Sequence, residues 1–190
     1  MGTIVCVEPS VSEEDSVVFC SQTDTLAYPH VDSCMTVTVF LQDGSVWGAH
    51  SPIYGSHDDF GSRDMATNAL VGMCQKISAV IQPPITKIVF VGFNTRKGIG
   101  DGTHYRISKA MGVFGLSKQF QGWAFVNTRN SDGPIDVFFD RPSQTLSVQN
   151  CDKGEQRAFL DAPALRQQAV FYTTAFNNLA GKIIEPPDSF

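Results

Sequence analysis

The chain has 190 residues, which is enough for one well-buried domain and short for two, so we expect a single domain over residues 1–190. Hydrophobic residues make up 42% of the chain and charged residues 17%, a balance typical of globular proteins rather than disordered or fibrous ones. A formal net charge of −5 offers no attraction for phosphates, so nucleic acid is not an expected partner.

Two short β-prone runs, residues 3–7 and 16–21, open the chain, and the polar turn between them predicts that they pair. The clearest local signal comes next. Residues 34–41 are almost continuously β-prone, Gln42-Asp43-Gly44-Ser45 is typical of a hairpin turn, and residues 46–53 return as a second strand.

The middle of the chain predicts two helices around one strand. Residues 63–82 carry apolar side chains at helical spacing, and Pro83-Pro84 ends that helix. Residues 87–93 are apolar enough for a central strand buried on both faces. After the glycine-rich loop 94–103, residues 104–116 predict a second, shorter helix.

The last third of the chain returns to strands. Residues 123–128, 135–140 and 144–149 predict three of them, separated by turn-forming residues. Apolar residues recur at helical spacing over residues 162–180, with Gly181 placed to cap a third helix. The expected fold is therefore α+β, with a mixed β-sheet rich in antiparallel hairpins and flanked by about three helices.

Hydropathy and cysteine usage narrow the functional classes further. No apolar run approaches the roughly 20 residues that a membrane helix needs, and the first fifteen residues are acidic where a secretory signal peptide would be basic. We expect no membrane span and no conventional signal peptide. The cysteines show no CxxC spacing and are odd in number, which argues against a zinc site or a disulfide scaffold. Cys6, Cys20 and Cys74 are expected to be buried as small apolar side chains.

Cys34 and His50 stand out as a candidate nucleophile and base. Cys34 follows an irregular loop at the entry to the first strand of the predicted hairpin, and His50 lies among small residues near the end of the second strand. A catalytic thiol needs a base beside it, exposure of its sulfur and N–H groups that can hold an oxyanion. This position in the chain is suited to all three.

The register of the hairpin decides whether the two side chains can meet. A two-residue Asp43-Gly44 turn would place His50 opposite Val37, with Cys34 on the other face of the sheet. A three-residue loop with Gly44 in the left-handed conformation would place His50 opposite Thr38, on the face of Cys34. Cys34 would then lie roughly 13 Å away along a regular strand, so that contact would require a bend or bulge at Cys34.

A family resemblance bears on the same residues. Ser33-Cys34 opening a hydrophobic strand, the Asp43-Gly44 turn and Gly48-Ala49-His50 followed by Pro52 resemble the signature of CheD, the bacterial chemoreceptor glutamine deamidase. The likeness covers roughly residues 33–149, including the strand-forming residues 87–92. The spacing of the cysteine and histidine is also similar to that in the cytotoxic necrotizing factor toxins, which deamidate host proteins. The resemblance implies a CheD-like fold and a cysteine-dependent protein glutamine deamidase.

The resemblance also implies roles for residues. Cys34 would attack the carboxamide of a protein glutamine and His50 would carry the protons, without ATP, metal or cofactor. Where the family has a threonine six residues before the cysteine, this chain has Tyr28. Thr25 is therefore the first candidate to orient His50, and a backbone carbonyl of residues 28–31 is the second. The expected partner is a protein substrate, either a host protein attacked by a secreted effector or toxin, or a receptor in the bacterial cytoplasm.

Other readings of the sequence remain open. His104 is a competing base, as in papain-like deamidases and proteases, with Asp136 or Asp140 as the third member. A related hydrolase or transglutaminase and a binding module with an inactive site are further alternatives. Residues 98–102 lack the last glycine of a dinucleotide motif and are expected to form a rim loop. His57-Asp58-Asp59 is expected to be a solvated loop rather than a metal site.

Overall fold

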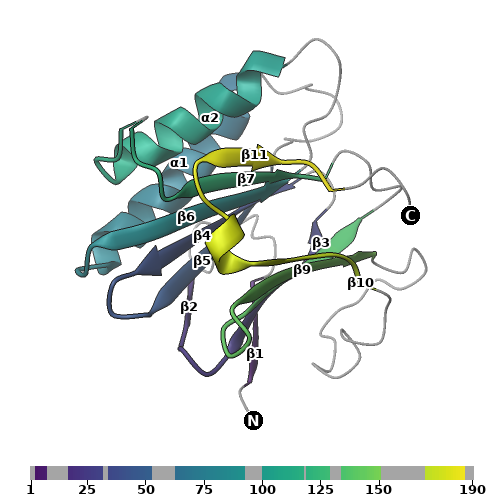
Figure 1. Ribbon diagram of the computed structural model, residues 1–190. Helices are drawn as coiled ribbons and strands as arrows, with labels where there is room; N and C mark the ends of the chain where they lie inside the picture. The colour runs from purple at the N-terminus through teal and green to yellow at the C-terminus, as the bar shows by residue number, and fades with distance from the viewer. Residues whose placement is uncertain are drawn as a thin grey trace.

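The part of the chain that the structure describes forms two β-sheets packed face to face, with two helices on the outer face of one sheet (Figure 1). This computed structural model describes residues 3–7, 17–31, 34–52, 63–92, 100–117, 119–128, 134–150 and 170–186. Each sheet mixes parallel and antiparallel pairs. The α+β prediction is confirmed, and the strands divide between two sheets rather than one.

The six-stranded sheet holds the predicted hairpin and the predicted central strand. Its strands in spatial order are β11 (Lys182–Ile184), β7 (Trp123–Asn127), β6 (Ile85–Gly92), β4 (Cys34–Leu41), β5 (Val46–Pro52) and β2 (Val17–Cys20). In β6, Ile88 and Phe90 pack beneath the helices, whereas Val89 and Val91 pack against the other sheet. A strand with apolar residues on both faces needs cover on both sides, which explains the unbroken apolar run in the sequence.

The five-stranded sheet runs in the order β1 (Ile4–Cys6), β3 (Thr25–Val31), β8 (Ile135–Asp140), β9 (Thr145–Asn150) and β10 (Val170–Ala175). The β1 strand pairs in parallel with β3, and β2 pairs antiparallel with β5 in the other sheet. The predicted pairing of residues 3–7 with residues 16–21 is therefore wrong, because the two runs complete different sheets.

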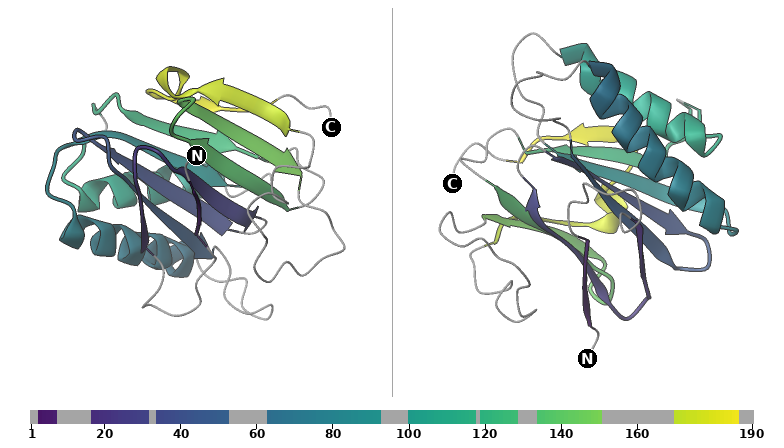
Figure 2. Two further views of the ribbon diagram at one scale, coloured as in Figure 1. Left: turned by 90° about the horizontal axis from the view of Figure 1, so that it is seen from below. Right: turned by 180° about the vertical axis from the view of Figure 1, so that it is seen from behind.

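Two helices cover the outer face of the six-stranded sheet (Figure 2), α1 (Arg63–Val80) and α2 (Gly100–Val113). They confirm the first two helix predictions. Their buried residues recur at the helical spacing seen in the sequence: Leu70, Met73, Cys74 and Ile77 in α1, and Ile107, Ala110 and Met111 in α2. Their burial against β4 and β6 is what holds these helices in place.

The third predicted helix is wrong where the structure describes it. Residues 170–175 form strand β10, Phe176–Asn178 form a single 3-10 turn (η1), and residues 182–184 form β11; residues 162–169 lie outside the described part of the chain. The stretch Val-Phe-Tyr-Thr-Thr in β10 is β-branched or aromatic throughout, and such side chains pack well on a pleated sheet. This preference outweighs the helical spacing.

An aromatic cluster fills the space between the sheets. Phe139 of β8 is fully buried, and its ring lies 6.0 Å from that of Tyr28, 5.8 Å from that of Phe40 and 6.1 Å from that of Phe176. Tyr28 and Phe139 come from the five-stranded sheet and Phe40 from the six-stranded one. Ring contacts of this kind fix the distance and angle between the sheets.

Arg141 braces the sheets at the turn end of the β4–β5 hairpin. Its Nη2 donates to the carbonyl of Gly44 at 2.5 Å, and its guanidinium lies 5.4 Å from the centre of the Phe40 ring and 5.9 Å from that of Phe176. Cys34 is at the opposite end of β4. The brace therefore joins the sheets far from the candidate site.

We expect Arg141→Lys to lower the free energy of unfolding by about 1–2 kcal/mol, because lysine keeps the charge but lacks the planar group that stacks and donates here. Urea denaturation followed by fluorescence would measure the loss. Iodoacetamide should alkylate Cys34 in Arg141→Lys at the same rate as in the unmodified protein. A variant whose Cys34 reacts much more slowly, with unchanged stability, would contradict the structural role.

Candidate active site

Four of the five cysteines lie in the described part of the chain, and all four are reduced thiols. Cys20 and Cys74 are fully buried as predicted, and burial raises their pKa values to about 11 and about 12. Cys34 is partly exposed, and so is Cys6, for which the predicted burial is wrong. A buried thiol of high pKa is a poor nucleophile, so Cys20 and Cys74 are not candidates for chemistry.

Cys34 is the first residue of β4 and faces the space between the sheets. Side chains alternate along a strand: Met35 and Val37 pack beneath the helices, whereas Phe40 and Cys34 belong to the core between the sheets. The sulfur therefore lies at the edge of the inter-sheet core, half-buried at the point where the strand begins.

His50 lies on the same face of the neighbouring strand. The β4–β5 ladder is regular from Cys34 onward and pairs Thr36 with His50 and Cys34 with Pro52. The loop is a three-residue one with Gly44 at φ 82°, as one alternative predicted, but it starts at Gln42 and closes between Leu41 and Ser45. His50 therefore faces Thr36, not Val37 or Thr38, and both predicted registers are wrong.

The observed register brings the pair closer than the sequence predicted. Cys34 is two residues, not four, from the position opposite His50. Such diagonal neighbours on one face of an antiparallel pair have Cα atoms about 7–8 Å apart and lie within reach of each other's side chains. The bulge that the sequence required lies elsewhere, in β3.

The imidazole of His50 is fully buried and held by one backbone group. Its Nδ1 lies 3.2 Å from the carbonyl oxygen of Val7. A carbonyl only accepts hydrogen bonds, so Nδ1 carries the proton and donates it. The other nitrogen, Nε2, is then the bare acceptor, and it has no hydrogen-bond partner within the described residues. A free lone pair therefore remains on the face that carries Cys34.

Burial lowers the pKa of His50 to about 4. The hydrogen bond to Val7 opposes this shift, and the charge of His30 adds to it. The ring is therefore neutral at neutral pH. A neutral imidazole can accept a proton, so His50 is available as a base at neutral pH.

Thr25, the predicted third member, lies elsewhere. Its hydroxyl donates to Asp140 at 2.7 Å. Along β3, Leu26 and Tyr28 face the inter-sheet core, whereas Ala27 packs on the outer face of the five-stranded sheet. Alternation places Thr25 with Ala27, on the side turned away from His50. The structure thus brings Cys34 and His50 together on one face and leaves Thr25 out.

The backbone carbonyl that binds His50 belongs to Val7, just after the N-terminal strand β1, and not to residues 28–31. Val7 follows β1, is fully buried, and donates its N–H to the carbonyl of Ala27 at 2.8 Å. This bond seats Val7 beside β3 and directs its own carbonyl at the imidazole. No residue type signals a role of this kind, because every residue carries a carbonyl.

A β-bulge in β3 precedes the site. It lies between Tyr28 and Val31, and His30 within it has φ 56°, a left-handed conformation that few residues other than glycine adopt. The buried carboxylate of Asp136 accepts a hydrogen bond from the His30 N–H at 2.9 Å and so satisfies a group that the bulge takes out of the ladder. Both Tyr28 and Val31 consequently face the core.

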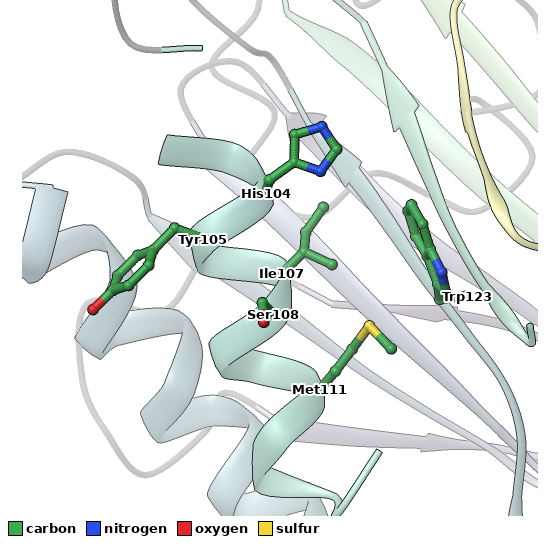
Figure 3. A pocket seen from close by; sticks show the side chains of 6 residues that line it. All are labelled: His104, Tyr105, Ile107, Ser108, Met111 and Trp123. Atoms are coloured by element: carbon green, nitrogen blue, oxygen red, sulfur yellow. The ribbon is translucent and has the colours of Figure 1, made fainter. Parts of the chain in front are cut away.

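His104 lies on the other side of the six-stranded sheet, in α2. It lines a cavity of about 410 Å³ with Tyr105, Ile107, Ser108, Met111 and Trp123. Figure 3 shows His104, Ile107 and Met111 along the side of α2 that faces Trp123. Ile107, Met111 and Trp123 belong to the core beneath the helices, whereas Cys34 belongs to the core between the sheets. The structure therefore does not bring His104 to Cys34.

The described part of the chain contains no candidate metal cluster and no candidate membrane-spanning helix. No three or more His, Cys, Asp or Glu side chains group there in a way that would hold a metal ion. Neither described helix combines the length and apolarity that crossing a membrane requires. The predicted solvated loop at residues 57–59 lies outside the described residues, as do residues 98 and 99 of the predicted rim loop. Residues 100–102 form the start of α2, so the loop prediction is wrong for that part.

No family model and no curated protein matches the chain. Among solved structures, the chain has a weak similarity to the crystal structure of the C-terminal domain of CNFy from Yersinia pseudotuberculosis, with a TM-score of 0.42 and 7% sequence identity. The match covers 90% of this chain and 61% of that one, so the chain spans less than two thirds of its length. At this level the similarity carries no argument about family or activity.

Proposed function

We propose that this chain is a cysteine-dependent protein glutamine deamidase with Cys34 as nucleophile and His50 as general base. One observation carries the proposal: a half-buried thiol and a neutral imidazole with a bare Nε2 share one face of two paired strands. A nucleophile within reach of a base that a third group orients is the signature of covalent catalysis. The residues around Cys34 and His50 resemble the motif of protein deamidases. This resemblance favours the side-chain carboxamide of glutamine as the group that Cys34 attacks.

In the first half of the reaction, His50 Nε2 accepts the thiol proton as the sulfur forms a bond to the carboxamide carbon. The tetrahedral intermediate collapses when the protonated imidazole gives that proton to the amide nitrogen. The carbon–nitrogen bond breaks, ammonia leaves and a thioester remains on Cys34. Since the imidazole is a weak base, proton transfer and sulfur attack are expected to occur together rather than through a resting thiolate.

In the second half, His50 takes a proton from water while the water oxygen attacks the thioester carbon. The carbon–sulfur bond breaks and Cys34 recovers its proton from the imidazole. Glutamine and water have become glutamate and ammonia. The target protein thereby gains one negative charge, a change large enough to alter ion pairs at its surface.

The alternatives predict different products. A transglutaminase would pass the acyl group to an amine instead of water, and a protease would cleave the chain. A papain-like arrangement through His104 draws no support from the geometry, because that histidine lies across the six-stranded sheet. A binding module with an inactive site would leave Cys34 unreactive toward iodoacetamide at neutral pH.

A glutamine-rich protein such as casein provides the first test. We expect the purified chain to release ammonia and to raise the mass of casein peptides by about one dalton for each glutamine converted. Chain blocked with iodoacetamide at Cys34 should do neither. Equal ammonia release by blocked and unblocked chain would overturn the proposal, and amine incorporation without hydrolysis would replace it with transglutamination.

The natural target belongs to the proposal as well. A host protein modified by a secreted effector or toxin is our first choice, and a bacterial receptor is the second. Comparing tryptic peptides of host-cell and bacterial lysates, each with active and with blocked chain, would locate the converted glutamine. Conversion confined to bacterial receptors would exclude the effector role.

A further inference from the structure

Tyr28 crosses the space between the two sheets. The residue is fully buried on β3, and its hydroxyl donates to the carbonyl of Val37 at 3.0 Å while lying 2.6 Å from the hydroxyl of Thr38. Both partners belong to β4 of the other sheet. Burial raises the pKa of the phenol, so it stays a neutral hydrogen-bond donor. A side chain of one sheet is thus fixed to the strand that begins with Cys34.

Gly48 makes room for this crossing. A Cβ atom placed on Gly48 would lie 2.4 Å from the Tyr28 hydroxyl oxygen, closer than two unbonded atoms can approach. Gly48 pairs with Thr38 and lies two residues before His50. Its lack of a side chain therefore has a specific reason: the phenol occupies the place where one would be.

The ring of Tyr28 also packs against His50. The two ring centres lie 6.1 Å apart at 83°, an edge-to-face contact. The Val7 carbonyl, which binds Nδ1 of the same imidazole, is held on the five-stranded sheet beside β3. His50 thus belongs to the six-stranded sheet but is held by two groups of the five-stranded sheet, the Val7 carbonyl and the Tyr28 ring.

We propose that Tyr28 is a positioning residue for His50: anchored to β4 over Gly48, its ring fixes the imidazole and shields from water the side that it packs against. The catalytic consequence rests on the proposed function, whereas the effect on the imidazole does not. The titratable groups that face His50 within the described residues are Tyr28 and His30 on β3 and Cys34 on β4, and β1 contributes only a carbonyl. No carboxylate takes part in this set.

Removal of the Tyr28 ring is therefore expected to change the pKa of His50 by letting water reach the imidazole. A smaller apolar side chain at position 28 would leave space beside the imidazole, and hydration stabilises the charged form of a histidine. His50 would then titrate closer to its ordinary value of 6.5. Its ring would also turn more freely, so that Nε2 would hold one orientation for less of the time.

The test compares Tyr28→Leu, Tyr28→Phe and Gly48→Ala with the control Phe40→Leu, which opens the same core at the other end of β4. NMR titration of the His50 ring gives its pKa, and the pH dependence of Cys34 alkylation by iodoacetamide reports its action as a base. We expect Tyr28→Leu and Gly48→Ala to raise the His50 pKa by about one unit or more. Tyr28→Phe keeps the ring and should raise it less, and Phe40→Leu should leave it in place.

An unmoved His50 pKa in folded Tyr28→Leu protein, or an equal shift in Phe40→Leu, would overturn the positioning role. If Tyr28→Leu fails to fold, Gly48→Ala decides, because it displaces the phenol while leaving Tyr28 in the chain. Ammonia release from casein is measured separately. Its absence in the unmodified protein would refute the deamidase proposal and leave the titration result standing.

Discussion

A Cys34→Ser protein is expected to release no measurable ammonia from a substrate that the unmodified chain deamidates, and a His50→Ala protein to react about 10²–10⁴-fold more slowly. A serine hydroxyl holds its proton far too tightly for an imidazole as weakly basic as His50, whose pKa is about 4. Alanine at position 50 leaves the thiol without an acceptor for its proton. Initial rates of ammonia release at neutral pH, under substrate-limited conditions, would measure both effects.

His104→Ala is the matched control for His50→Ala. It removes a histidine that lies beyond the opposite face of the six-stranded sheet, and we expect it to retain the full rate. A large loss in His104→Ala with normal activity in His50→Ala would reverse the assignment of the base. Circular dichroism of each variant would separate lost chemistry from lost folding, because His50 is fully buried.

The stability of the fold should fall steeply as acid is added, and His50 should account for about 3 kcal/mol of the loss. Burial lowers the pKa of His50 in the folded chain from 6.5 to about 4. The unfolded chain then binds more protons than the folded chain between these two values, so acid favours unfolding. The contribution is complete above pH 6.5 and disappears as the pH falls toward 4.

Urea denaturation of the unmodified protein and of His50→Gln at several pH values between these limits would isolate this contribution. Carboxylates and the remaining histidines affect both proteins alike, so the difference between the two curves belongs to position 50. We expect the unmodified protein to lose more stability toward acid than His50→Gln. Parallel curves would mean that the imidazole titrates normally, and that water reaches it.

The strong local patterns in the sequence predicted much of the fold. The apolar run that became β6 and the helical spacing that became α1 both survived, because each reflects burial of one element against its neighbours. The strand at residues 25–31 was missed, since Pro29 and the bulge at His30 interrupt its alternation. The helix predicted for residues 162–180 is wrong from residue 170 onward, because apolar spacing alone does not outweigh a β-branched and aromatic run.

The sequence could point to Cys34 and His50 as candidates, but it could not predict the groups that surround them. Cysteine and histidine can be recognised as a possible nucleophile and base from residue type alone. The turn at Gly44 also restricted the β4–β5 hairpin to a few possible registers. The Val7 carbonyl and the Tyr28 ring reach His50 from a different sheet. Their approach depends on how the sheets dock, a long-range outcome that no local pattern of residues 30–50 contains. Gly48 could be read from the sequence, but the reason for a glycine there, the Tyr28 phenol packed over it, depends on the three-dimensional structure.

The two sheets contribute different parts of the candidate site, and this affects the stage of folding at which the site is complete. Cys34 and His50 belong to one hairpin, which can form early because its strands are adjacent in the chain. The groups that select the tautomer of His50 and keep it dry arrive only with β1 and β3. A nascent or partly folded chain would carry a thiol and a hydrated, freely turning imidazole. We therefore expect the proposed reactivity of Cys34 to require that both sheets are in place, so that partly folded chain would not modify the proteins around it.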